Sequence, residues 1–213
     1  MNLLRYTLVA DGSSDQALIP ILTWLLRQTL GPKPIQGEFS DLRRLPNPPN
    51  RLAARIDRSA ELFPCELLFV HRDAERATIE HRVAEIRRAV RETSVATWPM
   101  VCVVPVRMQE AWLLIDETAL RAAAGNPNGK EPLDLPGIET LEGLPNPKQT
   151  LHELLRQASG LRGRRLRSFN ERLSGQRVAE LIEDFRPLYR LVAFQRLSAD
   201  VARAAKEQGW SSE

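Results

Sequence analysis

The stretch Leu3–Ser14, LLRYTLVADGSS, decides the fold class of this chain. Its apolar part is short and rich in β-formers, and the Asp-Gly-Ser-Ser that follows is typical of a tight turn. We therefore expect a buried strand that ends at Asp11. A helix should begin directly afterwards, because Ser13 or Ser14 can cap it and Asp15 favours its positive first turn.

Two further apolar runs end in the same way. The run 66–71, ELLFVH, leads into Asp73 and Glu75, and the run 100–106, MVCVVPV, leads into Glu110. Each of the three runs precedes a stretch with helical periodicity. Repeated alternation of strand and helix predicts an α/β fold, with a mostly parallel, Rossmann-like sheet flanked by helices.

The patterns along the whole chain predict three segments. Residues 1–125 form the α/β domain, with an edge strand between Ile35 and Arg44. Residues 126–147 are rich in Gly, Pro, Asn and acids, which indicates a long loop. Residues 148–213 contain helical patterns and no strand pattern, so we expect a helical C-terminal extension that packs on the same domain.

The composition is that of an ordinary globular protein. The chain has 213 residues, 43% of them hydrophobic, and a formal charge of +3, which is ordinary for a globular protein. Cys65 and Cys102 lack the spacing of a zinc site or a disulfide framework. There is no leader pattern and no apolar run of membrane-spanning length, so we expect a cytoplasmic protein without membrane contact.

The acids after the strands are the candidate chemistry. Carboxyl ends of neighbouring parallel strands open onto one crevice, where such proteins bind ligands. In an extended segment, Asp73 and Glu75 point to the same side and could hold Mg²⁺ or Mn²⁺. The alternative is a pair of solvated acids neutralised by Arg72 and Arg76. Glu110 is either a further ligand or a helix N-terminal acid stabilised by the helix dipole.

Several other residues could contact phosphate. The Asp11–Ser14 turn lies at a helix N-terminus that could dock an anion, although such turns also cap helices for structural reasons. Lys148 stands at the start of a predicted helix. The most basic stretch of the chain could hold nucleic acid without reading its sequence, or could be a solvated face; it contains Arg162, Arg164, Arg165 and Arg167.

Four segments together resemble a known family. They are LVADGSSDQALIPIL (8–22), LLFVHRDAE (67–75), VPVRMQEAWLLID (104–116) and NPKQTL (146–151). Their order and spacing are similar to those of TOPRIM domains in overcoming-lysogenization-defect type nucleases and in the related family DUF4276. The match covers scattered points from Leu3 to about Leu155.

This resemblance implies Mg²⁺-dependent cleavage or joining of phosphodiesters. It makes Asp11 a general acid/base or metal ligand, Asp73 and Glu75 metal ligands, and Lys148 a phosphate contact. Two positions depart from the family pattern: Asp11 replaces a Glu, and Glu75 replaces the second Asp of the acidic pair. Either change could move the ion or weaken the site.

The leading expectation is therefore a TOPRIM-like nuclease that acts on DNA or RNA, with a role in phage defence. Glu110 would be a further ligand or would position a water molecule. One alternative is a non-catalytic module that partners an ATPase in a defence or maintenance system. Another is a metal-dependent hydrolase of small phosphate esters.

Overall fold

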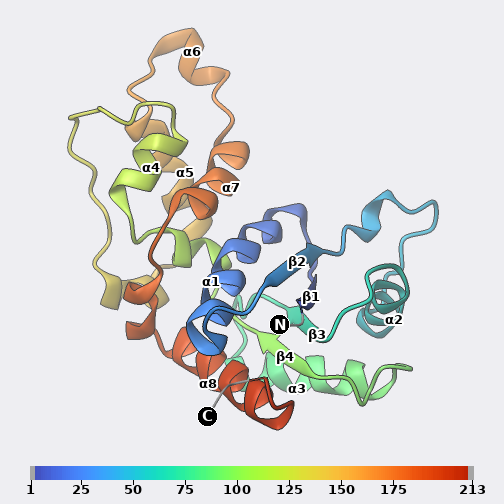
Figure 1. Cartoon of the computed structure of the whole chain (residues 1–213). Coiled ribbons are helices and arrows are strands. Elements are labelled where there is room, and N and C mark those ends of the chain that lie inside the picture. The colour runs from blue at the N-terminus through green and yellow to red at the C-terminus, as the bar shows by residue number, and fades with distance from the viewer. Residues whose placement is uncertain (1–2, 211–213) are drawn as a thin grey trace.

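A parallel sheet of four strands forms the centre of the protein. The computed structural model describes residues 3–210. The strands are β1 (Leu4–Val9), β2 (Ile35–Phe39), β3 (Leu67–His71) and β4 (Met100–Val103), in the spatial order β2-β1-β3-β4 (Figure 1). All pairings are parallel. The predicted α/β class, the three strong strands and the edge strand β2 are confirmed.

Helices occupy most of the remaining chain, and short 3₁₀ helices are labelled η. They are η1 (Ser13–Ala17), α1 (Leu18–Leu30), η2 (Leu42–Arg44), α2 (Leu52–Leu62), α3 (Ile79–Arg91), η3 (Gln109–Leu113), α4 (Glu117–Ala123), η4 (Ile138–Gly143), α5 (Pro147–Ala158), α6 (Gly163–Arg167), α7 (Glu171–Leu181), η5 (Arg186–Arg190) and α8 (Val192–Glu207). The segment after residue 148 is helical throughout its regular elements, as expected. None of the helices described is both long enough and apolar enough to span a membrane.

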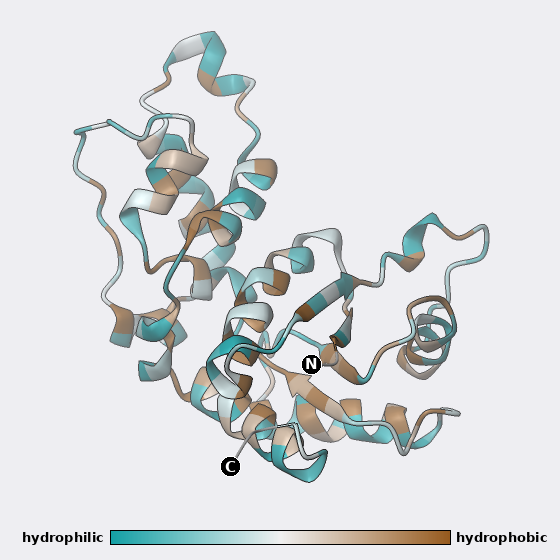
Figure 2. Cartoon of the chain, viewed as in Figure 1, coloured by the Kyte–Doolittle hydropathy of each residue, from teal (hydrophilic) through white to brown (hydrophobic). Residues whose placement is uncertain are grey.

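Alternating side chains of the strands face two separate cores. Leu8, Phe69 and Val103 belong to the larger core, which includes α1 and α8, whereas Val70 and Cys102 belong to the smaller core formed with α2 and α3. Side chains alternate across a strand, so a strand buried on both faces is apolar at every position. This explains the unbroken apolar runs of β3 and β4, whereas β2 at the edge of the sheet is of mixed hydropathy (Figure 2).

The edge strand depends on a glycine. A Cβ atom at Gly37 would lie only 2.3 Å from the ring of Tyr6 on β1. The Tyr6 hydroxyl donates to or accepts from Thr23 Oγ1 at 2.7 Å and donates to the Ile19 carbonyl at 2.9 Å, which ties β1 to α1. The side chain of Tyr6 therefore fills the space that Gly37 leaves open.

Helices α4, α5, α6 and α7 form a lobe that stands beyond the sheet (Figure 1). After this lobe the chain returns, and α8 packs against the sheet beside α1. Residues of the lobe and of the sheet share the larger core, for example Leu155 and Phe69. The predicted α/β domain begins at residue 1 and the predicted helical extension ends at residue 213. Residues 1–2 and 211–213 of these ranges lie outside the described residues.

The helical stretch that follows the third apolar run is divided. Residues 109–124 form η3 and then α4, because the Asp116 side chain accepts a hydrogen bond from the Ala119 backbone N–H at 3.0 Å and caps a new helix. An aspartate that bonds to the backbone ahead of it favours a helix start over a helix interior. The break leaves Gln109 and Glu110 on a separate 3₁₀ turn that faces the sheet edge.

Candidate functional site

The candidate site lies where the strand order changes direction. The chain passes from β1 outward to β2 and then back across to β3, so β1 and β3 flank the switch point. Ligands of open α/β sheets bind beyond the carboxyl ends of the strands at this point. Here the segments that follow β1, β3 and β4 converge, and each brings a carboxylate.

Asp15 is the carboxylate that follows β1. It is buried, and its oxygens accept hydrogen bonds from the Gly12 backbone N–H at 2.8 Å and the Ser14 hydroxyl at 3.1 Å. The bond to Gly12 closes a capping arrangement at the start of η1. A third donor, Gln109 Nε2, lies 2.9 Å from Asp15 Oδ1. These three donors hold a negative charge inside the protein.

Gln109 connects two of the acids. Its side-chain amide donates to Asp15, and its backbone N–H donates to Asp73 Oδ1 at 2.9 Å. Since the amide nitrogen must face the Asp15 carboxylate, the remaining amide atom, Oε1, is an acceptor. This oxygen is buried and has no hydrogen-bond partner among residues 3–210. A buried acceptor without a donor is unfavourable, and a bound cation would satisfy it.

Asp73, the carboxylate that follows β3, has an unusual environment. Burial raises the pKa of Asp73 to about 6; His71 opposes this rise, while the charges of Glu110 and Asp15 add to it. His71 is itself buried, and its Nδ1 lies 3.0 Å from the Val103 carbonyl oxygen. A carboxyl group whose pKa is raised by other carboxylates is a candidate functional residue.

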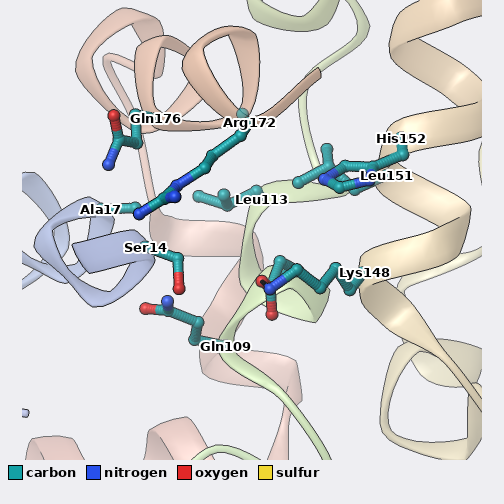
Figure 3. A pocket seen from close by; sticks show the side chains of 11 residues that line it. Ser14, Ala17, Gln109, Leu113, Lys148, Leu151, His152, Arg172 and Gln176 are labelled. Carbon is teal, nitrogen blue, oxygen red and sulfur yellow. Dashed lines mark ion pairs between the residues drawn. The ribbon is translucent and has the colours of Figure 1, made fainter. Parts of the chain in front are cut away.

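Glu110, the carboxylate that follows β4, faces the helical lobe. Its Oε1 lies 3.4 Å from Nζ of Lys148, the second residue of α5. Both residues line a pocket of about 30 Å³ between η1, η3, α5 and α7, together with His152 and Arg172 (Figure 3). A pocket of this size admits a water molecule or a small ion. Glu110 therefore stands between the acids of the sheet and the cations of the lobe.

Asp11 does not join these acids. Its carboxylate pairs with Arg55 of α2 and, at 3.0 Å, with Nε of Arg72. Arg55 also donates to the Ala10 carbonyl. The pairing turns Asp11 toward the α2 side of the strand ends, and Asp11 is not among the charges that act on Asp73.

Glu75 is not brought to Asp73 either. The expectation that residues 73–75 form an extended segment is wrong, because Glu75 adopts a left-handed conformation with φ of 52° in a turn closed by Ala77 N–H and the Ala74 carbonyl. The Glu75 side chain is 62% exposed and pairs with Arg82 at 3.2 Å. The turn therefore separates the two acids that an extended backbone would have aligned.

The predicted phosphate contacts fall into two groups. Ser14 and Lys148 line the pocket beside Glu110, and the Ser13 hydroxyl is buried nearby without a partner among the described residues. The arginine-rich segment lies on α6, at the polar tip of the lobe (Figures 1 and 2), and it has no carboxylate partner in the described chain; its members are Arg162, Arg164, Arg165 and Arg167. The structure thus separates these arginines from the pocket.

The donor set fits a divalent cation by its chemistry. Asp73, Glu110 and Gln109 Oε1 are hard oxygen donors of the kind that Mg²⁺ and Mn²⁺ prefer. Asp15 already accepts three hydrogen bonds, so its part is to hold Gln109 in place. As arranged, no three His, Cys, Asp or Glu side chains in residues 3–210 are grouped closely enough to hold an ion. The site would therefore have to tighten around the metal.

Sequence reasoning missed Gln109, His71 and the role of Asp15. The Gly12-x-x-Asp15 spacing is a partial signal, since an acid three residues after the first cap position can accept from its backbone N–H, which is one half of a capping box. His71 is a polar residue inside an apolar run, which is a second signal. Nothing in the sequence marks Gln109, because its importance comes from two acids that are distant along the chain.

Comparison with known proteins adds no assignment: no family model matches the sequence, and no curated protein or solved structure matches it significantly.

Proposed function

We propose that the protein is a Mg²⁺- or Mn²⁺-dependent nuclease, and that the acids beyond β1, β3 and β4 form its active site. The observation that carries this proposal is the convergence of Asp15, Asp73 and Glu110 at the switch point, where the charges of Asp15 and Glu110 act on Asp73. Like charges held together in a protein favour either a proton or a cation between them.

In this proposal Asp73, Glu110 and Gln109 Oε1 hold the ion. When bound, the metal would polarise a phosphate and stabilise the charge that develops during cleavage. Gln109 orients Asp73 through its backbone N–H, and Asp15 orients Gln109. Lys148 reaches the edge of the same acids from α5 and would contact a phosphate oxygen. The lobe thus supplies positive charge and the sheet supplies the carboxylates.

The direct test is cleavage of DNA and RNA with and without Mg²⁺ or Mn²⁺. We expect cleavage that requires the metal and disappears in Asp73→Asn, while Glu75→Gln remains active because Glu75 lies outside the cluster. Cleavage that persists in a clean Asp73→Asn/Glu110→Gln preparation would sink the proposal. A panel of small phosphate esters, assayed in parallel, separates a nuclease from a small-molecule phosphohydrolase.

A second candidate function is a non-catalytic module that partners an ATPase in a cytoplasmic defence or maintenance system. The specific observation in its favour is that both positions that depart from the family pattern, Asp11 and Glu75, are ion-paired with arginines. A metal that binds only the folded protein raises its melting temperature. A melting temperature that Mg²⁺ and Mn²⁺ leave unchanged, together with absence of cleavage, favours this module.

A further inference from the structure

A second hollow adjoins the pocket beside Glu110. It is an open groove of about 450 Å³ between η2 and the first turn of α7. Its floor includes Ser13 and Gln16 of η1, and its walls carry Arg43, Arg44 and Arg172. Arg172 and Gln176 line both the groove and the pocket, so the two hollows are neighbours.

The groove is positively charged. Its single carboxylate, Asp41, pairs with Arg43 at 2.8 Å and with Arg44 at 3.3 Å. Arg172 forms no ion pair within the described residues, and Figure 3 shows it extended from α7 toward Ser14 and Ala17. Three guanidinium groups therefore face one carboxylate, and the excess charge suits an anionic ligand.

Helix α7 holds this wall in place. Asn170 caps the helix by accepting a hydrogen bond from the Leu173 N–H at 3.0 Å, and Gln176 Nε2 donates to the Ser13 carbonyl at 2.9 Å. The second contact joins the lobe to the turn after β1. The position of Arg172 is thus fixed relative to the carboxyl ends of the strands. The Ser13 hydroxyl lies buried beneath the floor and has no partner among residues 3–210.

We propose that this groove binds the sugar-phosphate backbone of a nucleic-acid strand, with Arg172 as the contact closest to the reacting phosphate and Arg43 and Arg44 as contacts to a neighbouring phosphate. The inference rests on the proposed nuclease function and names its substrate-binding track. One phosphate is satisfied by a single bidentate arginine. Here Arg43 and Arg44 lie on one wall and Arg172 on the other, and Lys148 lies beside Glu110. This series of cations matches the repeated charges of a polynucleotide.

The test measures binding without cleavage. An Asp73→Asn background in EDTA is titrated with a fluorescein-labelled single strand of about ten nucleotides, a length typical of such sites. Affinity is followed across roughly 50 to 200 mM salt, because each phosphate contact to a single strand contributes about 0.7 to the slope of log K against log salt. Arg172→Gln is compared with Arg177→Gln, an exposed residue on the same helix that lines neither hollow.

We expect Arg172→Gln to weaken binding several-fold and to lower the slope by about 0.7, and Arg43→Gln/Arg44→Gln, which removes the contacts to one neighbouring phosphate, to lower it by about 0.7 as well. Arg177→Gln should match the background. Both residues are exposed, so melting temperatures should agree and exclude unfolding. Equal affinities and slopes for Arg172→Gln and Arg177→Gln would overturn the proposal that the groove binds nucleic acid. Competition by polyglutamate as strong as that by an unlabelled strand of matched charge would also overturn it.

The outcome also separates the groove from the activity. Arg172-dependent binding in EDTA without metal-dependent cleavage by the wild type supports the groove and rejects the nuclease. Metal-dependent cleavage that Arg172→Gln leaves unchanged, with unchanged binding, supports the nuclease and rejects the groove.

Discussion

Nε2 of His71 lies 3.5 Å from Oδ1 of Asp73, while Nδ1 of the same ring faces the Val103 carbonyl at 3.0 Å. A carbonyl only accepts, so Nδ1 carries a hydrogen. In a neutral ring Nε2 then presents a lone pair to the carboxylate, and two acceptors would face each other. The contact between Nε2 and Oδ1 is favourable when a single proton lies between them, on the ring or on the carboxylate. A single contact between a buried histidine and a partly buried aspartate thus couples a strand residue to the central acid of the site.

Asp73→Asn should stabilise the protein at neutral pH. With the folded-state pKa raised to about 6 from 3.8, the folded protein holds the proton more tightly than the unfolded chain. Stability from this group is greatest below about pH 4 and falls as the pH rises toward 6. At neutral pH the loss is about 3 kcal/mol. Urea unfolding of the wild type and of Asp73→Asn at pH 4 and pH 7 measures this loss. If the two proteins differ in free energy of unfolding by the same amount at both pH values, the prediction is contradicted.

Removing His71 should move the pKa of Asp73 further up. The charge of His71 favours the ionised carboxylate and opposes the effect of burial. In His71→Gln, Mn²⁺ binding followed by melting temperature should therefore require a higher pH than in the wild type, because the metal binds the carboxylate form. His152→Gln, which changes a histidine of the neighbouring pocket, is the control. A common pH midpoint for both variants argues against the coupling.

Glu75 should be dispensable for metal binding. It is exposed and paired with Arg82, and such surface pairs contribute about 0 to 1 kcal/mol. Isothermal titration of Mn²⁺ should give nearly the wild-type affinity for Glu75→Gln and a loss of at least about tenfold for Asp73→Asn. If both variants lose affinity equally, the turn at residues 75–77 opens when the metal binds, and the acids then meet as the sequence suggested.

Asp11 should act mainly on stability. It neutralises Arg55 and Arg72, two partly buried arginines from α2 and the segment after β3. Asp11→Ala leaves Arg55 without a carboxylate partner and leaves Arg72 with Glu85 alone, at 3.3 Å, and we expect a loss of about 1–3 kcal/mol in the free energy of unfolding. Glu92→Ala, which breaks the exposed pair with Arg51, should cost less than about 1 kcal/mol. Equal losses would show that the Asp11 network is no stronger than an ordinary surface pair.

The α6 arginines should matter only for long ligands. They lie at the tip of the lobe, away from the acids (Figure 1). A strand of about four nucleotides, at the short end of single-strand site sizes, can occupy the groove without extending to α6, so Arg164→Gln/Arg165→Gln should not change its affinity. A strand several times longer can also reach α6, and its salt slope should fall by about 1.4. Equal effects on both lengths would place α6 beside the groove instead.

Local sequence predicted the central strands well because β3 and most of β4 are buried on both faces and are therefore apolar, and because polar turns follow them. The edge strand β2 is half-buried and mixed in character, so its pattern is weaker. The site was harder to predict, since its geometry depends on backbone angles and distant contacts. Glu75 adopts a left-handed conformation that glycine usually adopts, so the residue type gives no sign of it in the sequence. The division at Asp116 depends on one capping bond, and Gln109 gains its place only when the turn after β1 lies against it.

The return of α8 to the sheet sets limits on how the chain can be shortened. Phe194 and Val201 fill the same core as Leu22 of α1, so any fragment that stops after the lobe would leave an apolar face of α1 and β4 open to water. Such a fragment should aggregate. The lobe itself, by contrast, leaves and re-enters at one end of the sheet. Loop tips such as the one around α6 are therefore the places where a tag or a reporter domain could be inserted without disturbing the fold.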